Sequence, residues 1–260
     1  MRSFLTALQF LTRIHLVEQQ NLTIEDFGRS VRTFPLVGLV LGVIAFLVGL
    51  FLVNFVGPSY VTAAVLTLLP IALTGGLHCD GFMDTADGLF SGRERDRMLE
   101  IMKDSRVGSF GVVAFGCALL FDFALILDLG QAPTILLIAV FLTPVIGRAA
   151  MVLAVACFPY ARPAGLGKMF HDLAGRGAAR AALVVSAAVA APWGIGALIV
   201  LLLSLGAAWL FDRWATGKLG GLTGDIYGAT EKLTETCVLA AFWMLLHLPQ
   251  AQVLLGGWHF

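Results

Sequence analysis

Long apolar stretches, separated by short polar ones, dominate the chain. No charged residue lies between Arg32 and Asp80, between Arg180 and Asp212, or after Glu235. Each of these gaps is longer than the roughly 20 residues that a helix needs to cross a bilayer. The apolar stretches predict about seven transmembrane helices, at residues 34–55, 60–77, 108–129, 134–158, 178–191, 195–211 and 234–254. An all-α, polytopic transmembrane helix bundle is therefore expected.

Two parts of this pattern leave alternatives open. The stretches 178–191 and 195–211 meet at Pro192, and they fit either a hairpin of two spans or a re-entrant segment, so six to eight spans agree with the pattern. Residues 1–33 form an amphipathic N-terminal segment, whose helical spacing of apolar side chains is typical of a helix lying in the membrane interface. We find no internal repeat, and residues 1–260 are expected to form one membrane domain.

Composition supports the membrane assignment. Hydrophobic residues make up 58% of the chain and charged residues 13%, and the mean hydropathy is +0.89, which excludes a water-soluble globule. The 17 basic and 17 acidic residues cancel, so nothing indicates a nucleic-acid partner. The four cysteines form no CxxC pair, and neither a disulfide framework nor a zinc site is expected.

The basic residues indicate how the bundle is oriented. If the spans alternate, every Lys and Arg except Arg148 falls on the same side as the N-terminus. The positive-inside rule then places the N-terminus and the long loops in the cytoplasm and the C-terminus in the periplasm. Arg148 lies inside a predicted span, where it is either a functional ion or a side chain that snorkels to the headgroups.

Three aspartates follow the second predicted span at a helical spacing. Asp80, Asp84 and Asp87 stand at i, i+4 and i+7, which places them within about 60° of one helical face. Such a row of carboxylates indicates a divalent cation, and oxygen ligands favour Mg²⁺ or Mn²⁺ over zinc. The alternative is an ordinary acidic helix start. His78 is either a further ligand or acid/base group, or an ordinary hydrogen-bonding residue.

Further polar residues are expected on the same side of the membrane. One glycine-rich loop carries the cations Arg162 and Lys168. Such a loop can bind phosphate, because its backbone N–H groups and its charged side chains contact the anion together. A second glycine-rich loop carries the acid Asp225. The candidates for binding phosphate or substrate are His78, Lys103, Asp104, Arg106, Arg148, Arg162 and Lys168.

Five segments together resemble the cobalamin-5′-phosphate synthase family, along nearly the whole chain. They are ALQFLTRIHL from Ala7, GLHCDGFMDTADG from Gly76, MKDSRVGSFG from Met102, RPAGLG from Arg162 and GGLTGDIYGA from Gly220. The resemblance implies an adenosylcobinamide-GDP ribazoletransferase of the bacterial cytoplasmic membrane. It also implies a Mg²⁺-dependent transferase of a phosphorus-containing group.

The expected reaction follows from this resemblance. A hydroxyl of α-ribazole or of α-ribazole 5′-phosphate attacks the cobinamide-side phosphorus of adenosylcobinamide-GDP, and GMP leaves. Asp80, Asp84 and Asp87 would be catalytic metal ligands, with Asp225 as a further catalytic ligand or base. Arg162 and Lys168 would hold phosphate.

Two other functions are weighed beside this one. A CDP-alcohol phosphatidyltransferase also carries spaced Asp and Gly residues, but its usual Ala-Arg pair is missing because Leu89 and Phe90 follow Gly88. A transporter would carry ionisable residues near mid-membrane on several spans, and only Asp122 and Arg148 are candidates. Membrane lipid is an expected partner, and homo-oligomer formation stays open.

Overall fold

The computed structural model describes residues 2–15 and 23–248, and this part of the chain is built from helices without β-strands. Only one isolated bridge occurs there, between Tyr160 and Leu222. The all-α prediction is confirmed. The elements are α1 (Arg2–Leu11), α2 (Ile24–Ser30), η1 (Val31–Thr33), α3 (Phe34–Phe55), α4 (Tyr60–Thr74), α5 (Leu77–Leu89), α6 (Arg95–Ile101), α7 (Ser109–Leu129), α8 (Pro133–Cys157), α9 (Leu166–Ala190), η2 (Ala191–Trp193), α10 (Gly194–Leu219) and α11 (Gly224–His247).

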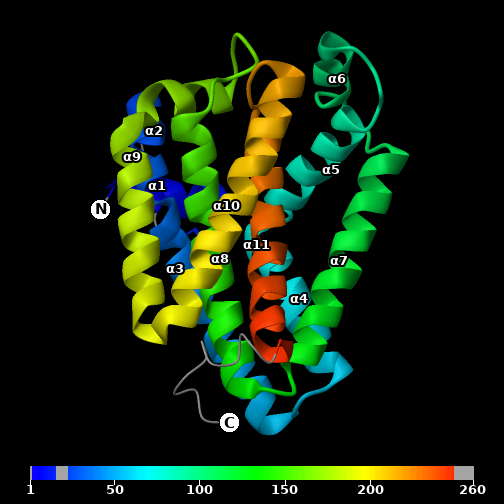
Figure 1. The fold of residues 1–260 in the computed structure, drawn as a ribbon. Helices are drawn as coiled ribbons and strands as arrows, with labels where there is room; N and C mark the ends of the chain where they lie inside the picture. Colours follow the sequence, from blue (N-terminus) through cyan, green and yellow to red (C-terminus); the bar gives the residue numbers. More distant parts are fainter. Residues whose placement is uncertain (1, 16–22, 249–260) are drawn as a thin grey trace.

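Helix α8 forms the centre of the bundle, and α3, α9, α10 and α11 pack around it (Figure 1). The closest approach is to α3 at Gly38 and Gly42. A Cβ atom there would lie 2.3 Å from the Pro144 carbonyl oxygen and 2.2 Å from that of Phe141. In a membrane, burying an apolar side chain against protein gains little over leaving it in lipid, so helices associate mainly through close packing. Small residues allow this close packing of one helix backbone against another.

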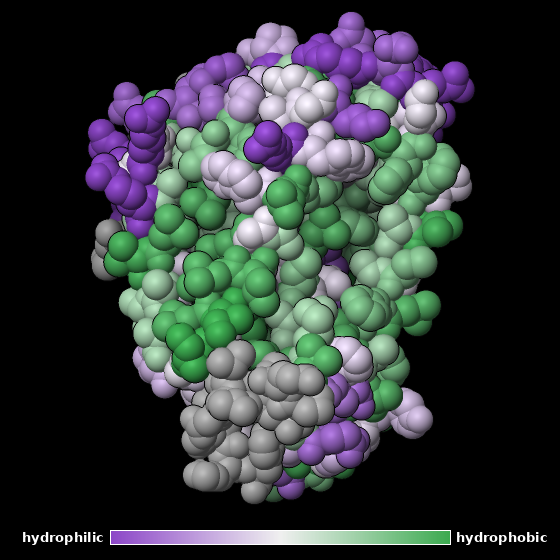
Figure 2. All heavy atoms as spheres, viewed as in Figure 1, coloured by the Kyte–Doolittle hydropathy of each residue, from purple (hydrophilic) through white to green (hydrophobic). Residues whose placement is uncertain are grey.

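The surface agrees with a membrane location. Apolar side chains cover the middle of the molecule and polar ones gather at its upper end (Figure 2). In the described residues, four helical stretches are long and apolar enough to cross a bilayer, and the bent pair α4–α5 adds a fifth. One of the four, 166–219, contains α9 and α10, which fold back on each other at η2 as a hairpin (Figure 1). The predicted count of seven spans is not confirmed.

A sharp bend separates α4 from α5. Gly75 and Gly76 both have positive φ, at 66° and 77°, and the two helix axes differ by 92°. Glycine adopts this left-handed conformation without a steric penalty. The Arg13 side chain lies against Gly75, and the Arg13 N–H donates to the Leu73 carbonyl at 2.8 Å. The aspartates therefore lie on a separate helix, α5, which follows the predicted second span as expected but at a sharp angle to it.

The N-terminal helix differs from its predicted role. Ala7, Leu8 and Leu11 are at most 2% exposed, and Phe10 packs on the rings of Phe27, Phe34 and Phe170. The apolar face of α1 is thus covered by protein. Lying in the membrane interface is therefore not the role of this face, because neighbouring helices bury it instead.

The last helix also differs from its predicted bounds. Helix α11 begins at Gly224, ten residues before the predicted start at 234. Its first half carries Glu231, Lys232 and Glu235, and all three side chains are buried. Residues 249–260, on which the predicted periplasmic C-terminus falls, lie outside the described residues.

Candidate active site

The aspartates of α5 lie at the upper end of the bundle, where α11 begins (Figure 1). Asp80 is exposed, Asp84 is half-buried and Asp87 is buried. The carboxylates of Asp80, Asp87 and Asp225 lie close enough to Asp84 to act on its charge. The expectation that Asp225 joins the α5 aspartates therefore agrees with the geometry.

Gly81 is the reason that the two helices can meet. A Cβ atom at this position would lie 2.7 Å from the backbone oxygen of Asp225. The N-terminus of α11 therefore rests directly on the backbone of α5, between Asp80 and Asp84. The missing side chain of Gly81 thus makes room for the neighbouring helix.

The two glycine-rich loops are joined to each other and to the carboxylates. The Ala161 N–H donates to the Leu222 carbonyl at 2.8 Å, and the Leu222 N–H donates to the Pro159 carbonyl at 2.8 Å. Through this pairing, Arg162 reaches the carboxylate of Asp225 at 2.9 Å. Burial raises the pKa of the nearby Tyr160 hydroxyl, so it remains a neutral hydroxyl beside this ion pair.

Asp87 serves a structural purpose in this arrangement. Its carboxylate accepts the backbone N–H groups of Gly108 at 2.6 Å and Gly111 at 2.9 Å, which holds the start of α7 against α5. A carboxylate near a helix N-terminus satisfies amides that have no partner within the helix. This differs from the predicted use of Asp87 as a metal ligand.

The carboxylates of Asp80 and Asp84 suit a metal ion that is held jointly with the substrate, rather than one enclosed by protein ligands alone. Among the described residues, no three His, Cys, Asp or Glu side chains are arranged to hold a metal ion. Mg²⁺ commonly takes only one or two carboxylates and completes its shell with water and substrate phosphate. Asp80 and Asp84 suit this role, because we find no hydrogen bond or ion pair between either side chain and the rest of the described chain.

The other predicted substrate-binding residues are spread around this end. Arg106 binds the Asp104 carboxylate at 2.7 and 3.0 Å and lowers the pKa of that group to about 2. Both residues line a surface groove together with Asp87. Lys103 is exposed in the same connection, and Lys168 pairs with Asp172 on α9.

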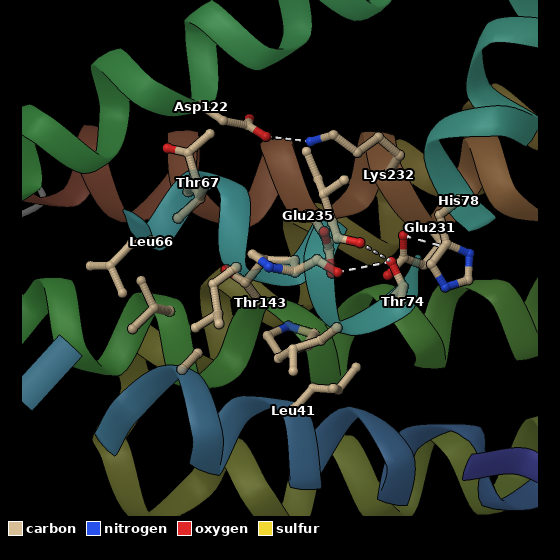
Figure 3. Close-up of a pocket in the computed structure, with 18 of the residues that line it drawn as sticks. Leu41, Leu66, Thr67, Thr74, His78, Asp122, Thr143, Glu231, Lys232 and Glu235 are labelled. Atoms are coloured by element: carbon tan, nitrogen blue, oxygen red, sulfur yellow. Dashed lines mark hydrogen bonds and ion pairs between the residues drawn. The ribbon is translucent and has the colours of Figure 1, made fainter. Parts of the chain in front are cut away.

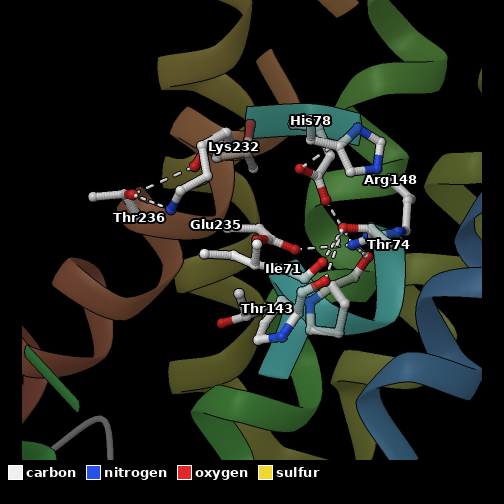
Figure 4. A network of polar contacts seen from close by, with 12 residues as sticks. Ile71, Thr74, His78, Thr143, Arg148, Lys232, Glu235 and Thr236 are labelled. Atoms are coloured by element: carbon white, nitrogen blue, oxygen red, sulfur yellow. Dashed lines mark hydrogen bonds and ion pairs between the residues drawn. The ribbon is translucent and has the colours of Figure 1, made fainter. Parts of the chain in front are cut away.

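Arg148 lies in the interior instead of at the predicted phosphate site. Its guanidinium is 0% exposed, and Nη1 lies 2.6 Å from Glu231 Oε1 and 2.9 Å from Glu235 Oε1 (Figure 4). Arg148 therefore neither snorkels to the surface nor lies among the loops where phosphate binding was expected. Glu231 was missed as a partner because the last span was predicted to start after it, and Glu235 was missed although it lies in the first turn of that predicted span.

A second buried pair lies beside the first. Lys232 binds Asp122, and Thr236 donates its hydroxyl to the other Asp122 oxygen at 2.7 Å. Asp122, Lys232 and Glu235 line an interior cavity between α3, α4, α5, α7, α8 and α11 (Figure 3). The spacing of Glu231 and Glu235 at i, i+4 was the signal in the sequence that could have identified this network.

His78 lies between this interior network and the carboxylates. It is 4% exposed, its Nδ1 lies 3.9 Å from Glu231 Oε2, and neither ring nitrogen has a hydrogen-bond partner among the described residues. His78 lines the interior cavity and also a second pocket that contains Asp80 and Asp225. It is therefore within reach of a molecule bound at the carboxylates.

Fold and site together define a helical membrane protein with a carboxylate-rich site, flanked by cations and glycine-rich loops, at one end of its bundle. Residues 3–243 match the model of the Cobalamin-5-phosphate synthase family, and the chain belongs to that family. This confirms the resemblance noted in the sequence.

Similar proteins cover nearly the whole chain. The "Adenosylcobinamide-GDP ribazoletransferase" of Desulfitobacterium hafniense (strain Y51) is 40% identical over 256 residues, which are 95% of this chain and 98% of that protein. The protein of the same name from Pseudomonas aeruginosa (strain PAO1) is 41% identical over 244 residues, which are 93% and 97% of the two chains. No solved structure matches this chain.

Proposed function

We propose that this chain is an adenosylcobinamide-GDP ribazoletransferase that uses α-ribazole or α-ribazole 5′-phosphate as the acceptor. A hydroxyl oxygen of the acceptor forms a bond to the cobinamide-side phosphorus, and the bond from that phosphorus to the oxygen of GMP breaks. The products are GMP and adenosylcobalamin or its 5′-phosphate. The observation that carries this proposal is that Asp80 and Asp84, which have no hydrogen bond or ion pair within the described residues, lie beside the Arg162–Asp225 pair at one end of the bundle.

The carboxylates of Asp80 and Asp84 would hold Mg²⁺ together with phosphate oxygens of the substrate. The metal, when bound, supplies neutralisation of the phosphate charge. Asp225 is placed to accept the proton of the attacking hydroxyl, and Arg162 fixes the orientation of that carboxylate. Arg162 also offers guanidinium N–H groups to phosphate oxygens, for which its planar fork is well suited.

We place the protein in the bacterial cytoplasmic membrane with its active site facing the cytoplasm. Apart from Arg148 and Lys232, the basic residues of the described chain lie in the N-terminal segment, in the α5–α7 and α8–α9 connections with α6, in the first part of α9 and in the last part of α10. Cytoplasmic loops of membrane proteins carry an excess of such residues. Both soluble substrates would then reach the carboxylates from the cytoplasm.

The proposal is tested with purified protein in detergent, adenosylcobinamide-GDP, α-ribazole and Mg²⁺. We expect GMP and adenosylcobalamin to appear in equal amounts, and neither to appear when the acceptor or Mg²⁺ is left out. Release of CMP from a CDP-alcohol, with no GMP from the corrinoid substrate, would instead support a phosphatidyltransferase. Absence of both products would contradict an enzyme of either kind.

A further inference from the structure

A pocket opens beside the carboxylates, between α1, α5, α8, α9 and α11. It offers about 630 Å³ of free space, part of it open to solvent. Its apolar walls come from five side chains in four helices, Phe10, Leu77, Met151, Leu166 and Phe170. Asp80 and Asp225 belong to the same lining, so a molecule in this pocket also reaches the candidate active site.

Two buried polar side chains of the lining have no hydrogen-bond partner within residues 2–15 and 23–248. Tyr227 is 1% exposed, and its hydroxyl has no hydrogen-bond partner in the described residues. Neither ring nitrogen of His78 has a hydrogen-bond partner in the described residues either. Buried polar groups in proteins nearly always have a partner, so such groups in a pocket indicate that a ligand supplies it.

The pocket also has open space where α11 begins. At Gly224, another lining residue, no heavy atom lies within 4 Å of the position that a Cβ would occupy. The rings of Phe10 and Phe170 lie 5.1 Å apart between centroids and form a preassembled aromatic wall. Aromatic faces favour a flat, apolar ring as their occupant.

We propose that this pocket binds the base of the ribazole acceptor, which is a planar and largely apolar benzimidazole. Its sugar then lies toward Asp80 and Asp225, and Tyr227 donates its hydroxyl to the ring nitrogen that is not bonded to ribose. A guanine base suits the pocket less, because its several donors and acceptors would face hydrocarbon side chains. The assignment rests on the proposed function and adds to it the residues that select the acceptor.

The Tyr227 hydroxyl provides the first test. We expect Tyr227→Phe to raise the KM for α-ribazole about tenfold, the usual effect of one lost hydrogen bond, with kcat and the KM for adenosylcobinamide-GDP nearly unchanged. The thermal midpoint should not fall, because the hydroxyl has no described protein partner to lose. Tyr60→Phe is the matched control, since Tyr60 is 73% exposed at the start of α4.

Filling the pocket provides the second test. Leu166 is 45% exposed in the first turn of α9, so Leu166→Trp adds volume without opening the core. We expect the KM for α-ribazole to rise at least about tenfold, and the increase to shrink for an acceptor in which imidazole replaces benzimidazole. Leu183→Trp is the control, because Leu183 is 44% exposed on the same helix and is absent from the lining.

Calorimetric titration of α-ribazole into each detergent-solubilised variant separates this inference from the proposed function. If wild type binds α-ribazole, both pocket variants weaken binding and no GMP is ever formed, the pocket assignment stands and the proposed reaction fails. If GMP is formed while both pocket variants keep wild-type KM and Kd, the reaction stands and the pocket assignment is overturned. Binding that neither variant alters would leave the pocket to another occupant, such as a lipid chain.

Discussion

The charges inside the bundle explain the placement of Arg148. A guanidinium in a membrane interior is tolerated when carboxylates neutralise it and accept its N–H groups. Here Glu235 accepts an Arg148 N–H at 2.9 Å, and Glu231, four residues before it on the same helix, forms an ion pair with Arg148. Arg148 therefore links α8 to α11 through these ion pairs.

We expect Arg148→Leu to destabilise the protein by about 3–5 kcal/mol, because two buried carboxylates lose their cation. The measurement is thermal unfolding in detergent. Adding Glu235→Leu should recover part of the loss, since one uncompensated charge is removed. Arg97→Leu is the control, because this arginine forms only an exposed pair with Glu100. A single Arg148→Leu variant as stable as wild type would contradict the pairing.

Stability measurements can also distinguish a structural role of Asp87 from a role as a metal ligand. Asp87→Asn replaces one acceptor oxygen by a donor facing the N–H groups of Gly108 and Gly111. We expect a loss of about 1–3 kcal/mol in stability and no change in the Mg²⁺ concentration that gives half-maximal rate. A variant of normal stability that requires several-fold more Mg²⁺ would instead make Asp87 a metal ligand.

At the scale of helices, the contact of α5 with α11 assembles the site. Gly81→Ala would place a methyl group 2.7 Å from the Asp225 backbone oxygen, so one helix must shift. We expect kcat to fall at least about tenfold, since small displacements of reacting groups cost that much. Gly116→Ala is the control, because no heavy atom lies within 4 Å of its added Cβ. Equal activity of the two variants would show that the contact is unimportant.

The helices differ in how well the sequence predicted them. The spacing of Asp80, Asp84 and Asp87 predicted α5 correctly, because a row of like residues at i, i+4 and i+7 needs only local geometry. The start of α11 was missed because a stretch of sequence with several charged residues resembles a loop when the buried partners of those charges are unknown. The bend at Gly75 was not predicted, although the Gly75-Gly76 pair that permits it is present in the sequence.

For the whole molecule, the gathering of polar loops at one end follows from charge distribution, and the sequence predicted it. The sequence did not predict which loop residues contact each other, because such pairs depend on how the helices pack across the bundle. The Arg162–Asp225 pair agrees with the predicted convergence of the two glycine-rich loops. Lys168 pairs within its own helix instead, which a single sequence could not distinguish from phosphate binding.

Orientation in the membrane is a testable property of the whole chain. A reporter inserted after Ser91, between α5 and α6, should behave as cytoplasmic, because the arginines Arg93, Arg95 and Arg97 follow directly. A reporter inserted at Gln131, in the turn between α7 and α8, should behave as periplasmic. Reporters that give the same side at both positions would contradict a membrane-crossing α7.

The assignment of the active site to the α5 aspartates is tested most directly by the rate of GMP release from adenosylcobinamide-GDP by Asp84→Asn protein. We expect a rate below about a tenth of wild type, because the amide keeps the shape of the side chain but loses the charge that a divalent cation requires. Asp96→Asn, at a carboxylate that is 87% exposed on α6, should retain the wild-type rate. Both proteins should be recovered from membranes in wild-type amounts. GMP release by Asp84→Asn at the rate of the Asp96→Asn control would contradict the assignment of the active site to these aspartates.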